Sequence, residues 1–204
     1  MKKLLFVLII ISIISCKTEK QESKVALDEL SLKTYFQKSQ LPSAIMGYSN
    51  KEGKMEWFAF GPSIWGGKDT VSENNIFRIY SMTKAIASVA ALQLVEKGLI
   101  GLDDPLDKLM PEMTSIPILK ETGELVEAKK AITLRNLLTH TAGFGYEFLD
   151  DRLQSFDKSK WEYDDLPRLF EAGERWQYGT NTDWVGKIVE KISGEDLESY
   201  LRTN

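Results

Sequence analysis

A serine and a lysine three residues apart open the most strongly helical stretch of this 204-residue chain. They are Ser81 and Lys84, in the run FRIYSMTKAIASVAALQLVEKG at residues 77–98. Side chains at positions i and i+3 share one helix face, so the amine can reach the hydroxyl. A serine hydroxyl becomes an effective nucleophile only when a base removes its proton. The pair therefore predicts attack on a carbonyl by Ser81, with Lys84 taking part in the proton transfer.

A lysine accepts a proton only when its amine is neutral, so its surroundings must disfavour the charged form. The free side chain has a pKa of about 10.4, whereas a general base near neutral pH needs about 7 to 8. Apolar residues at helical spacing, among them Met82, Ile86 and Val89, predict a helix over residues 82–97 that is apolar nearly all round and interior. Burial and the positive end of the helix dipole both act against an ammonium. We therefore expect the pKa of Lys84 to be lowered.

The same spacing occurs a second time, at Ser155 and Lys158, so the pattern alone has little specificity. This second pair lies in the charged run LQSFDKSKW, where we expect both side chains to be solvated. A solvated lysine stays protonated near neutral pH. The sequence context therefore favours chemistry at Ser81 over Ser155.

Three long segments of the chain together resemble one enzyme family. Residues 77–112 resemble the first active-site segment of the serine β-lactamase-related hydrolases, above all the class C β-lactamases and their esterase and D-Ala-D-Ala-peptidase relatives. LRNLLTHTAGF, at residues 134–144, resembles a second family segment. RWQYGTNTDWVGKIVEKISG, at residues 175–194, resembles the segment that holds the family's catalytic tyrosine. The resemblance covers roughly residues 25–204.

The resemblance implies a fold class and further site residues. The implied fold is α+β and β-lactamase/transpeptidase-like, with an antiparallel sheet flanked by helices and a mostly helical subdomain. Tyr178 matches the tyrosine of the family's Tyr-x-Asn motif. The third motif position is Thr180, and an asparagine, Asn181, follows one residue later. Either Thr180 supplies a hydroxyl to the substrate, or Asn181 has moved into the site, and loss of the motif asparagine is more typical of the esterases.

The family's third motif, Lys-Thr-Gly or His-x-Gly on a later strand, is not found. Lys51, Glu52 and Gly53 fit Lys-x-Gly, but they lie near the start of the chain, where they indicate a hairpin turn. That strand also gives the family its second oxyanion-hole donor. The chain stops within a helical pattern at residues 197–204, so we expect a C-terminally truncated member that lacks one of three site elements.

The histidine and the loop aspartates are expected to have ordinary structural roles. His140 is the only histidine, and without a Gly-x-Ser-x-Gly elbow a Ser-His-Asp triad has no support. We expect it to end a short helix and bond to nearby backbone. Four loop carboxylates could be grouped as a metal site but are expected to be solvated: Asp103, Asp104, Asp164 and Asp165. No metal or organic cofactor is implied, and a net charge of −4 without a basic block argues against nucleic acid.

The N-terminus has the pattern of a lipoprotein signal. Two lysines precede an apolar run at residues 4–14, too short to span a bilayer but suited to a secretory signal. The run ends in IISC, which resembles the bacterial lipobox, so Cys16, the only cysteine, is predicted to carry lipid. We divide the chain into a signal peptide at 1–15, a polar tether at 16–24 and the hydrolase domain at 25–204. The expected location is the bacterial cell envelope, facing the periplasm or the exterior.

Local patterns predict the elements around the site. We expect a helix at residues 25–38 and a β-hairpin at 44–61. Thr133 is expected to cap a short helix at residues 134–140 that Gly143 closes. These predictions use only spacing and turn chemistry.

The later part of the chain contains two more predicted helices. Apolar residues at 185, 188, 189 and 192 mark one helix. SGED, at residues 193–196, resembles a capping box that opens the next helix. Residues 150–168 are charged and are expected to be irregular.

The sequence thus predicts a serine hydrolase that acts through an acyl-enzyme, with Ser81, Lys84 and Tyr178 as catalytic residues. Its expected substrate is a small-molecule ester, β-lactam or acyl-D-Ala peptide, and Thr180 favours the ester. The alternative is a binding lipoprotein that keeps the fold without turnover. An intact Lys/His-x-Gly strand would support the enzyme, and a degraded one the binding protein.

Overall fold

The computed structural model describes residues 29–49 and 51–204, which form two compact units divided between Phe77 and Arg78. The predicted signal peptide, Cys16 and the tether lie outside the described residues. Within the described part of the chain, no helix has the length and apolar content needed to cross a membrane.

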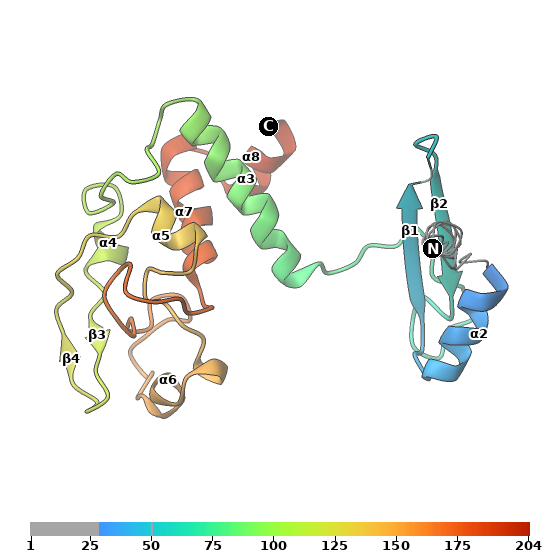
Figure 1. The fold of residues 1–204 in the computed structure, drawn as a ribbon, viewed down its shortest axis with the longest axis horizontal. Helices are drawn as coiled ribbons and strands as arrows, with labels where there is room; N and C mark the ends of the chain where they lie inside the picture. The colour runs from blue at the N-terminus through green and yellow to red at the C-terminus, as the bar shows by residue number, and fades with distance from the viewer. Residues whose placement is uncertain (1–28, 50) are drawn as a thin grey trace, which may run out of the picture. The chain divides into compact units, whose positions relative to one another are not determined.

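The first unit pairs a helix with a β-hairpin (Figure 1). Its elements are α2 (Glu29–Ser39), β1 (Ala44–Ser49) and β2 (Met55–Phe60). The strands are antiparallel, with Ala44 opposite Phe60, which confirms the predicted hairpin. Phe36 of α2 stacks on Phe58 of β2, with ring centroids 5.6 Å apart, and so fixes the helix on the hairpin. The Lys-x-Gly residues form the connecting turn, where Gly53 has φ +76°, as the sequence predicts.

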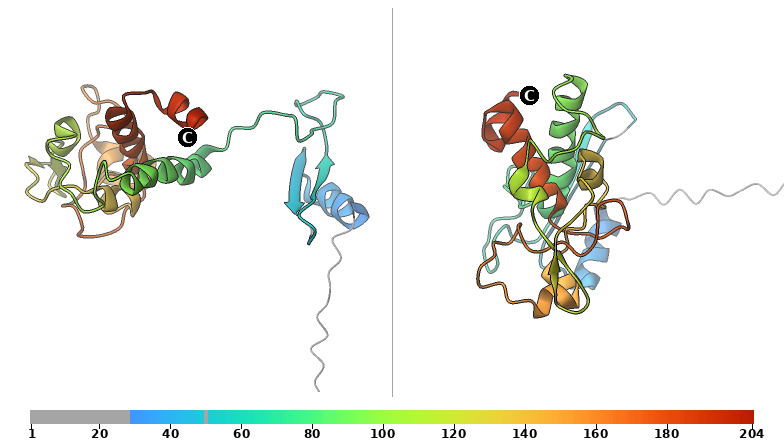
Figure 2. Two further views of the ribbon diagram at one scale, coloured as in Figure 1. Left: turned by 90° about the horizontal axis from the view of Figure 1, so that it is seen from above. Right: turned by 90° about the vertical axis from the view of Figure 1, so that its left-hand side faces the viewer.

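The second unit is mostly helical and contains all the candidate catalytic residues. Its elements are the 3-10 turn η1 (Tyr80–Met82), α3 (Thr83–Glu96), α4 (Pro111–Thr114), β3 (Ile118–Leu119), β4 (Leu125–Val126), α5 (Leu134–Leu138), the 3-10 turn η2 (Glu147–Leu149), α6 (Asp151–Ser155), α7 (Asn181–Ser193) and α8 (Leu197–Thr203). Helix α3 lies alongside α7, and α5 packs against α7 (Figures 1 and 2). Strands β3 and β4 pair antiparallel.

A single apolar core joins these helices. It includes Leu94 of α3, Leu134 and Leu137 of α5, and Val185 and Ile188 of α7, all with exposed fractions of 1% or less. The apolar spacing of α3 and α7 accounts for this seam, because residues three and four apart return to one helix face. The core thus fixes the second half of α3 against the middle of α7.

The prediction that α3 is interior on every side is wrong. Ala87, Ala90 and Leu94 are buried, but Ile86 and Val89 are 44% and 57% exposed. Among the described residues of the second unit, those of α7 and the core cover one side of α3 and leave the other side exposed. The small alanines on that side let α3 approach its neighbours closely.

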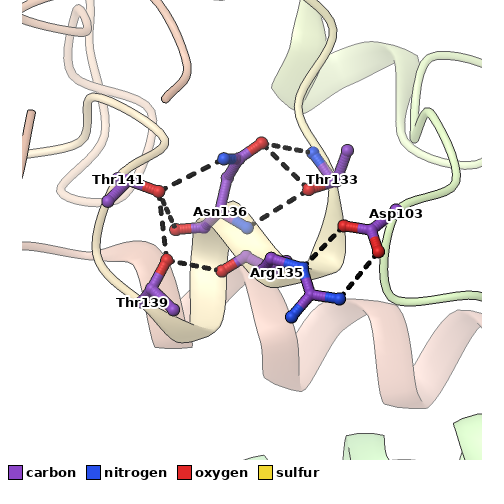
Figure 3. Close-up of polar contacts among 6 residues, drawn as sticks. All are labelled: Asp103, Thr133, Arg135, Asn136, Thr139 and Thr141. Atoms are coloured by element: carbon purple, nitrogen blue, oxygen red, sulfur yellow. Dashed lines mark hydrogen bonds and ion pairs between the residues drawn. The ribbon is translucent and has the colours of Figure 1, made fainter. Parts of the chain in front are cut away.

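Helix α5 begins where the sequence predicts. The Thr133 side chain accepts from the backbone N–H of Asn136, and the Asn136 side chain accepts from the N–H of Thr133, which completes a capping box. Figure 3 shows this box together with the bidentate pair between Arg135 and Asp103, at 2.6 and 2.7 Å. The helix ends at Leu138, and the chain then turns sharply at His140, where φ is +54°.

Two local predictions in this unit are wrong. Ser193 ends α7 instead of capping the next helix, because Gly194 takes a left-handed conformation (φ +75°) and closes α7. Asp196 is the actual cap, since its carboxylate accepts from the N–H of Ser199. Residues 150–168 are not wholly irregular either, because Asp150 caps the short helix α6.

Candidate active site

Ser81 lies in a tight turn at the entrance to α3. It is the central residue of η1, and α3 begins two residues later. The preceding residue, Tyr80, has φ +44°, a left-handed conformation that is uncommon for a residue with a side chain. Ser81 is exposed. The turn therefore presents the hydroxyl to solvent at the helix N-terminus, where the helix dipole stabilises negative charge.

Lys84 lies one turn further along and reaches back to Ser81. Its Nζ donates to Ser81 Oγ at 3.3 Å. The amine also lies over two aromatic rings, 5.0 Å from the centroid of Tyr178 and 5.7 Å from that of Tyr146. Lys84 is half-buried, so these rings and the hydroxyl provide much of its surroundings. The spacing of Ser81 and Lys84 thus produces the contact that the sequence predicts.

Tyr178 reaches the same hydroxyl from a distant part of the chain. Its phenol donates to Ser81 Oγ at 2.8 Å, across 97 residues of sequence. Tyr178 lies in the segment just before α7, and Gly179 presses this segment against the backbone of Phe144. A Cβ built on Gly179 would lie 2.3 Å from the carbonyl oxygen of Phe144. Only glycine permits this approach, which holds Tyr178 in reach of Ser81.

The electrostatics of the pair differ from the prediction that Lys84 is readily neutral. Burial lowers the pKa of Lys84, but its interactions with the phenol groups of Tyr178 and Tyr146 outweigh burial and raise it above its ordinary value. The expected lowering is therefore wrong. The pKa of Tyr178 is lowered, first through its hydrogen bond with Ser81 and then through Lys84. The arrangement favours a charged amine beside a phenol that ionises more easily.

Thr180 and Asn181 are both buried at the start of α7, with exposed fractions of 3% and 0%. The Asn181 amide donates to His140 Nδ1 at 3.0 Å and to the carbonyl oxygen of Phe144 at 3.3 Å. Among the described residues, neither side chain forms a hydrogen bond with Ser81, Lys84 or Tyr178. Asn181 therefore holds His140 and the backbone of Phe144 in place and does not contact the nucleophile.

The second Ser-x-x-Lys pair is not assembled. Ser155 donates to the carbonyl oxygen of Asp151 at 2.7 Å, as a helical serine often does. Lys158 is engaged with backbone carbonyls, including that of Gln154 at 3.0 Å, and with Glu147 at 3.1 Å. The amine is thus less solvated than predicted, but it is not directed at Ser155.

The loop carboxylates have individual partners. Asp103 pairs with Arg135, and Asp164 pairs with Lys187. Asp104 accepts from the N–H of Gly101, and Asp165 accepts from that of Glu162. Across residues 29–49 and 51–204, no group of three or more histidine, cysteine or acidic residues has the arrangement of a metal site.

Near the pair, reasoning from sequence missed Tyr146 and gave His140 only a structural role at the end of a helix. Tyr146 is only 7% exposed, and its ring lies edge-to-face against Tyr178 with centroids 5.3 Å apart. His140 lies 4.9 Å from the Tyr178 ring. Both follow α5; His140 lies in the second of the three family-like segments, and Tyr146 lies two residues beyond its end. That segment was the available signal, but spacing alone does not show which residues of a loop turn toward a distant serine.

A pocket of about 400 Å³ borders the site between α3 and α7. Lys84 and Thr83 line one side, and Asp183 and Lys187 line the other. Ser81 and Tyr178 are not among its lining residues. Lys84 is therefore the side chain that connects this pocket with the nucleophile.

Comparison with a family model and with curated proteins points to one family. The family model described as Beta-lactamase matches residues 36–204. Monacolin J acid methylbutanoyltransferase of Aspergillus terreus is 37% identical over 142 residues, which are 62% of this chain and 34% of that protein. Lovastatin esterase of Penicillium rubens is 32% identical over 160 residues, which are 67% of this chain and 38% of that protein.

A solved structure agrees with these relatives. Simvastatin synthase (LovD) from Aspergillus terreus superposes with a TM-score of 0.74 at 32% identity, over 88% of this chain and 51% of that one. The predicted β-lactamase/transpeptidase-like fold is thereby confirmed. The chain spans about half of that structure and about a third of the curated relatives named above.

Proposed function

We propose that this chain, which belongs to the beta-lactamase family, performs serine-dependent acyl transfer through an acyl-enzyme on Ser81. One observation carries the proposal. Ser81 Oγ lies 2.8 Å from the phenol of Tyr178 and 3.3 Å from the amine of Lys84. A nucleophile within hydrogen-bonding distance of a proton acceptor is the basic requirement of covalent acyl transfer.

The electrostatics support Tyr178 as the group that takes the proton. Lys84 stays charged and stabilises the phenolate form of Tyr178. In acylation the phenolate accepts the proton of Ser81 while Oγ forms a bond to the ester carbonyl carbon. The phenol then returns this proton to the departing alkoxide as the carbon–oxygen bond of the ester breaks.

Release of the acyl group repeats these steps with a new acceptor. Water or an alcohol gives its proton to the Tyr178 phenolate and attacks the acyl carbon. Ser81 departs and recovers the proton from the phenol. Negative charge that develops at the carbonyl lies close to the N-terminus of α3, where the helix dipole is favourable.

An ester is the substrate class that the observations support. Of the relatives named above, one is named as a methylbutanoyltransferase and the other as an esterase, and both names describe acyl transfer chemistry. Thr180 in place of the motif asparagine also favours an ester over a β-lactam or an acyl-D-Ala peptide. Both hydrolysis and transfer to an alcohol proceed from the same acyl-enzyme, and they differ only in the acceptor.

The test is covalent labelling of the protein by an activated ester. Incubation with p-nitrophenyl acetate is expected to release a burst of nitrophenol and to leave an acetyl group on Ser81, located by mass spectrometry. Ser81→Ala should abolish the burst. Ser155→Ala is the matched control, because Lys158 is bonded elsewhere, and it should leave the burst unchanged. Absence of any acyl-enzyme on Ser81 would favour the non-catalytic binding protein.

We also propose that Cys16 anchors the protein by lipid in a bacterial cell envelope, facing the periplasm or the exterior. The support is the IISC boundary after the apolar run at residues 4–14 and the polar run that follows it. A polar run of this composition suits a flexible tether.

A further inference from the structure

His140 lies at the back of the Tyr178 ring in a conformation that the surrounding backbone imposes. Its φ is +54°, and its carbonyl oxygen accepts from the N–H of Gln177 at 2.9 Å. This bond ties the loop after α5 to the segment that carries Tyr178. The two rings lie 4.9 Å apart at a tilt of 51°. A residue with a side chain keeps a left-handed conformation only where its surroundings compensate for the cost.

The hydrogen bonds of Asn181 fix the form of the imidazole. The Asn181 amide nitrogen lies 3.0 Å from His140 Nδ1 and 3.3 Å from the carbonyl oxygen of Phe144. If the Asn181 amide were flipped, its oxygen would face the carbonyl oxygen of Phe144, and two acceptors would meet. The amide nitrogen therefore donates both to that carbonyl oxygen and to His140 Nδ1. His140 Nδ1 must then accept, which places the ring hydrogen on Nε2. A doubly protonated ring would set two donors against each other.

The charged neighbour acts in the same direction. The titratable groups near the ring are Lys84 of α3 and Tyr178, while Asn181 of α7 and Trp176 are neutral. Burial, and next the charge of Lys84, lower the pKa of His140. The Asn181 side chain is fully buried, so water does not compete for the Nδ1 contact.

We propose that His140 is a positioning residue whose neutral imidazole, held in the Nε2–H form by Asn181, supports the Tyr178 ring and keeps its phenol on Ser81. The inference rests on the proposed function of Ser81. A neutral ring gives this support without adding a second positive charge beside Lys84. It also keeps water from the side of the Tyr178 ring that it contacts.

The first experiment measures His140 directly, by NMR of the 15N-labelled protein. The chain has one histidine, so every imidazole signal belongs to it. We expect the Nε2–H form near neutral pH and a protonation midpoint below the ordinary value of about 6.5. In Asn181→Asp the carboxylate can accept from a protonated Nδ1, so the midpoint should rise. An Nδ1–H form in the wild type, or an ordinary midpoint, would overturn the proposal.

The second experiment measures the effect on Tyr178. His140→Asn tolerates a positive φ and keeps an acceptor near the position of Nδ1, but it removes the outer part of the ring. We expect the acylation rate to fall roughly tenfold to a hundredfold, as displaced catalytic groups generally cause. The pH midpoint of acylation and the 13Cζ titration of Tyr178 should both move up toward ordinary tyrosine, with an unchanged melting temperature.

Gln40→Asn is the matched control, because Gln40 also has a positive φ (+59°) and lies in the other unit. It should change neither the rate nor the Tyr178 titration. A His140→Asn protein with the wild-type pH midpoint and wild-type Tyr178 signal would overturn the proposal. If the wild type forms no acyl-enzyme, the proposed function fails, while the two NMR titrations still decide whether His140 positions Tyr178.

Discussion

Substitution of Lys84 separates two roles that the amine could have beside Ser81. Its Nζ lies 5.0 Å from the centroid of the Tyr178 ring. At that distance two unit charges attract by about 1 to 3 kcal/mol for an effective dielectric constant between 80 and 20, the range suited to a half-buried site. Loss of this attraction corresponds to roughly 5-fold to 150-fold in rate. Lys84→Ala should therefore slow acylation by about that factor, even though Tyr178 remains.

Lys84→Arg keeps the charge but cannot give up a proton near neutral pH. If Lys84 acts through its charge, Arg should retain clearly more activity than Ala. Tyr178→Phe should lose more than either, by roughly 10²-fold to 10⁴-fold, because it removes the proton acceptor. The assay is the burst rate with p-nitrophenyl acetate as a function of pH. The wild-type rate should rise as Tyr178 ionises, and Lys84→Ala should move that rise to higher pH.

One pattern would refute this reasoning. It is a Lys84→Arg protein as slow as Lys84→Ala, together with a Tyr178→Phe protein that keeps most of its activity. Lys84 would then be the proton acceptor, and the raised pKa that its phenol neighbours produce would not govern the reaction. Ser155→Ala again serves as the control for unspecific effects of substitution.

Three further predictions follow from other parts of the chain. Gly179→Ala should nearly abolish acylation, because the new Cβ would lie 2.3 Å from the carbonyl oxygen of Phe144. Gly123→Ala is the control, since a Cβ there meets open space. It should cost only about 1 to 2 kcal/mol of stability for its positive φ and leave acylation unchanged. Because the pKa of His140 is lowered in the folded state, the imidazole of the unfolded chain takes up a proton at higher pH than that of the folded chain. Denaturant melts should therefore show the free energy of unfolding falling as the pH drops below about 6.5. His140→Asn should remove this part of the pH dependence. In a bacterium, labelled fatty acid should be incorporated into the wild type but not into Cys16→Ser, and equal labelling of both would contradict the lipid anchor.

Local sequence signals were sufficient for much of the scaffold. The capping box at Thr133 and Asn136 places the start of α5, since both partners lie within four residues. The β1–β2 hairpin follows from two β-prone runs around a glycine turn. The contact between Ser81 and Lys84 follows from helical spacing alone. In each case the residues that determine the structure are neighbours in sequence.

Features that depend on tertiary packing were not predictable in the same way. Exposure of Val89 depends on which side of α3 is covered, and an apolar pattern all round the helix does not specify a side. The electrostatics of Lys84 depend on Tyr146 and Tyr178, which are 62 and 94 residues away in sequence. A rule based on burial considers only the helix itself and therefore predicts the wrong direction for its pKa.

The backbone shows why the site needs partners from distant segments. In the described residues, three non-glycine residues have a positive φ, and two of them, Tyr80 and His140, border Ser81 and Tyr178. Each such conformation costs of order 1 to 3 kcal/mol and persists only where surrounding contacts enforce it. At Tyr80 the strain turns Ser81 outward at the start of α3, and at His140 it sets the imidazole against the phenol. No local pattern identifies these positions, and at His140 the compensating contacts come from Asn181 of α7 and Gln177 of the segment before it. The reactive hydroxyl is thus placed by helical spacing, while the groups that act on it are placed by the folding of distant segments onto α3.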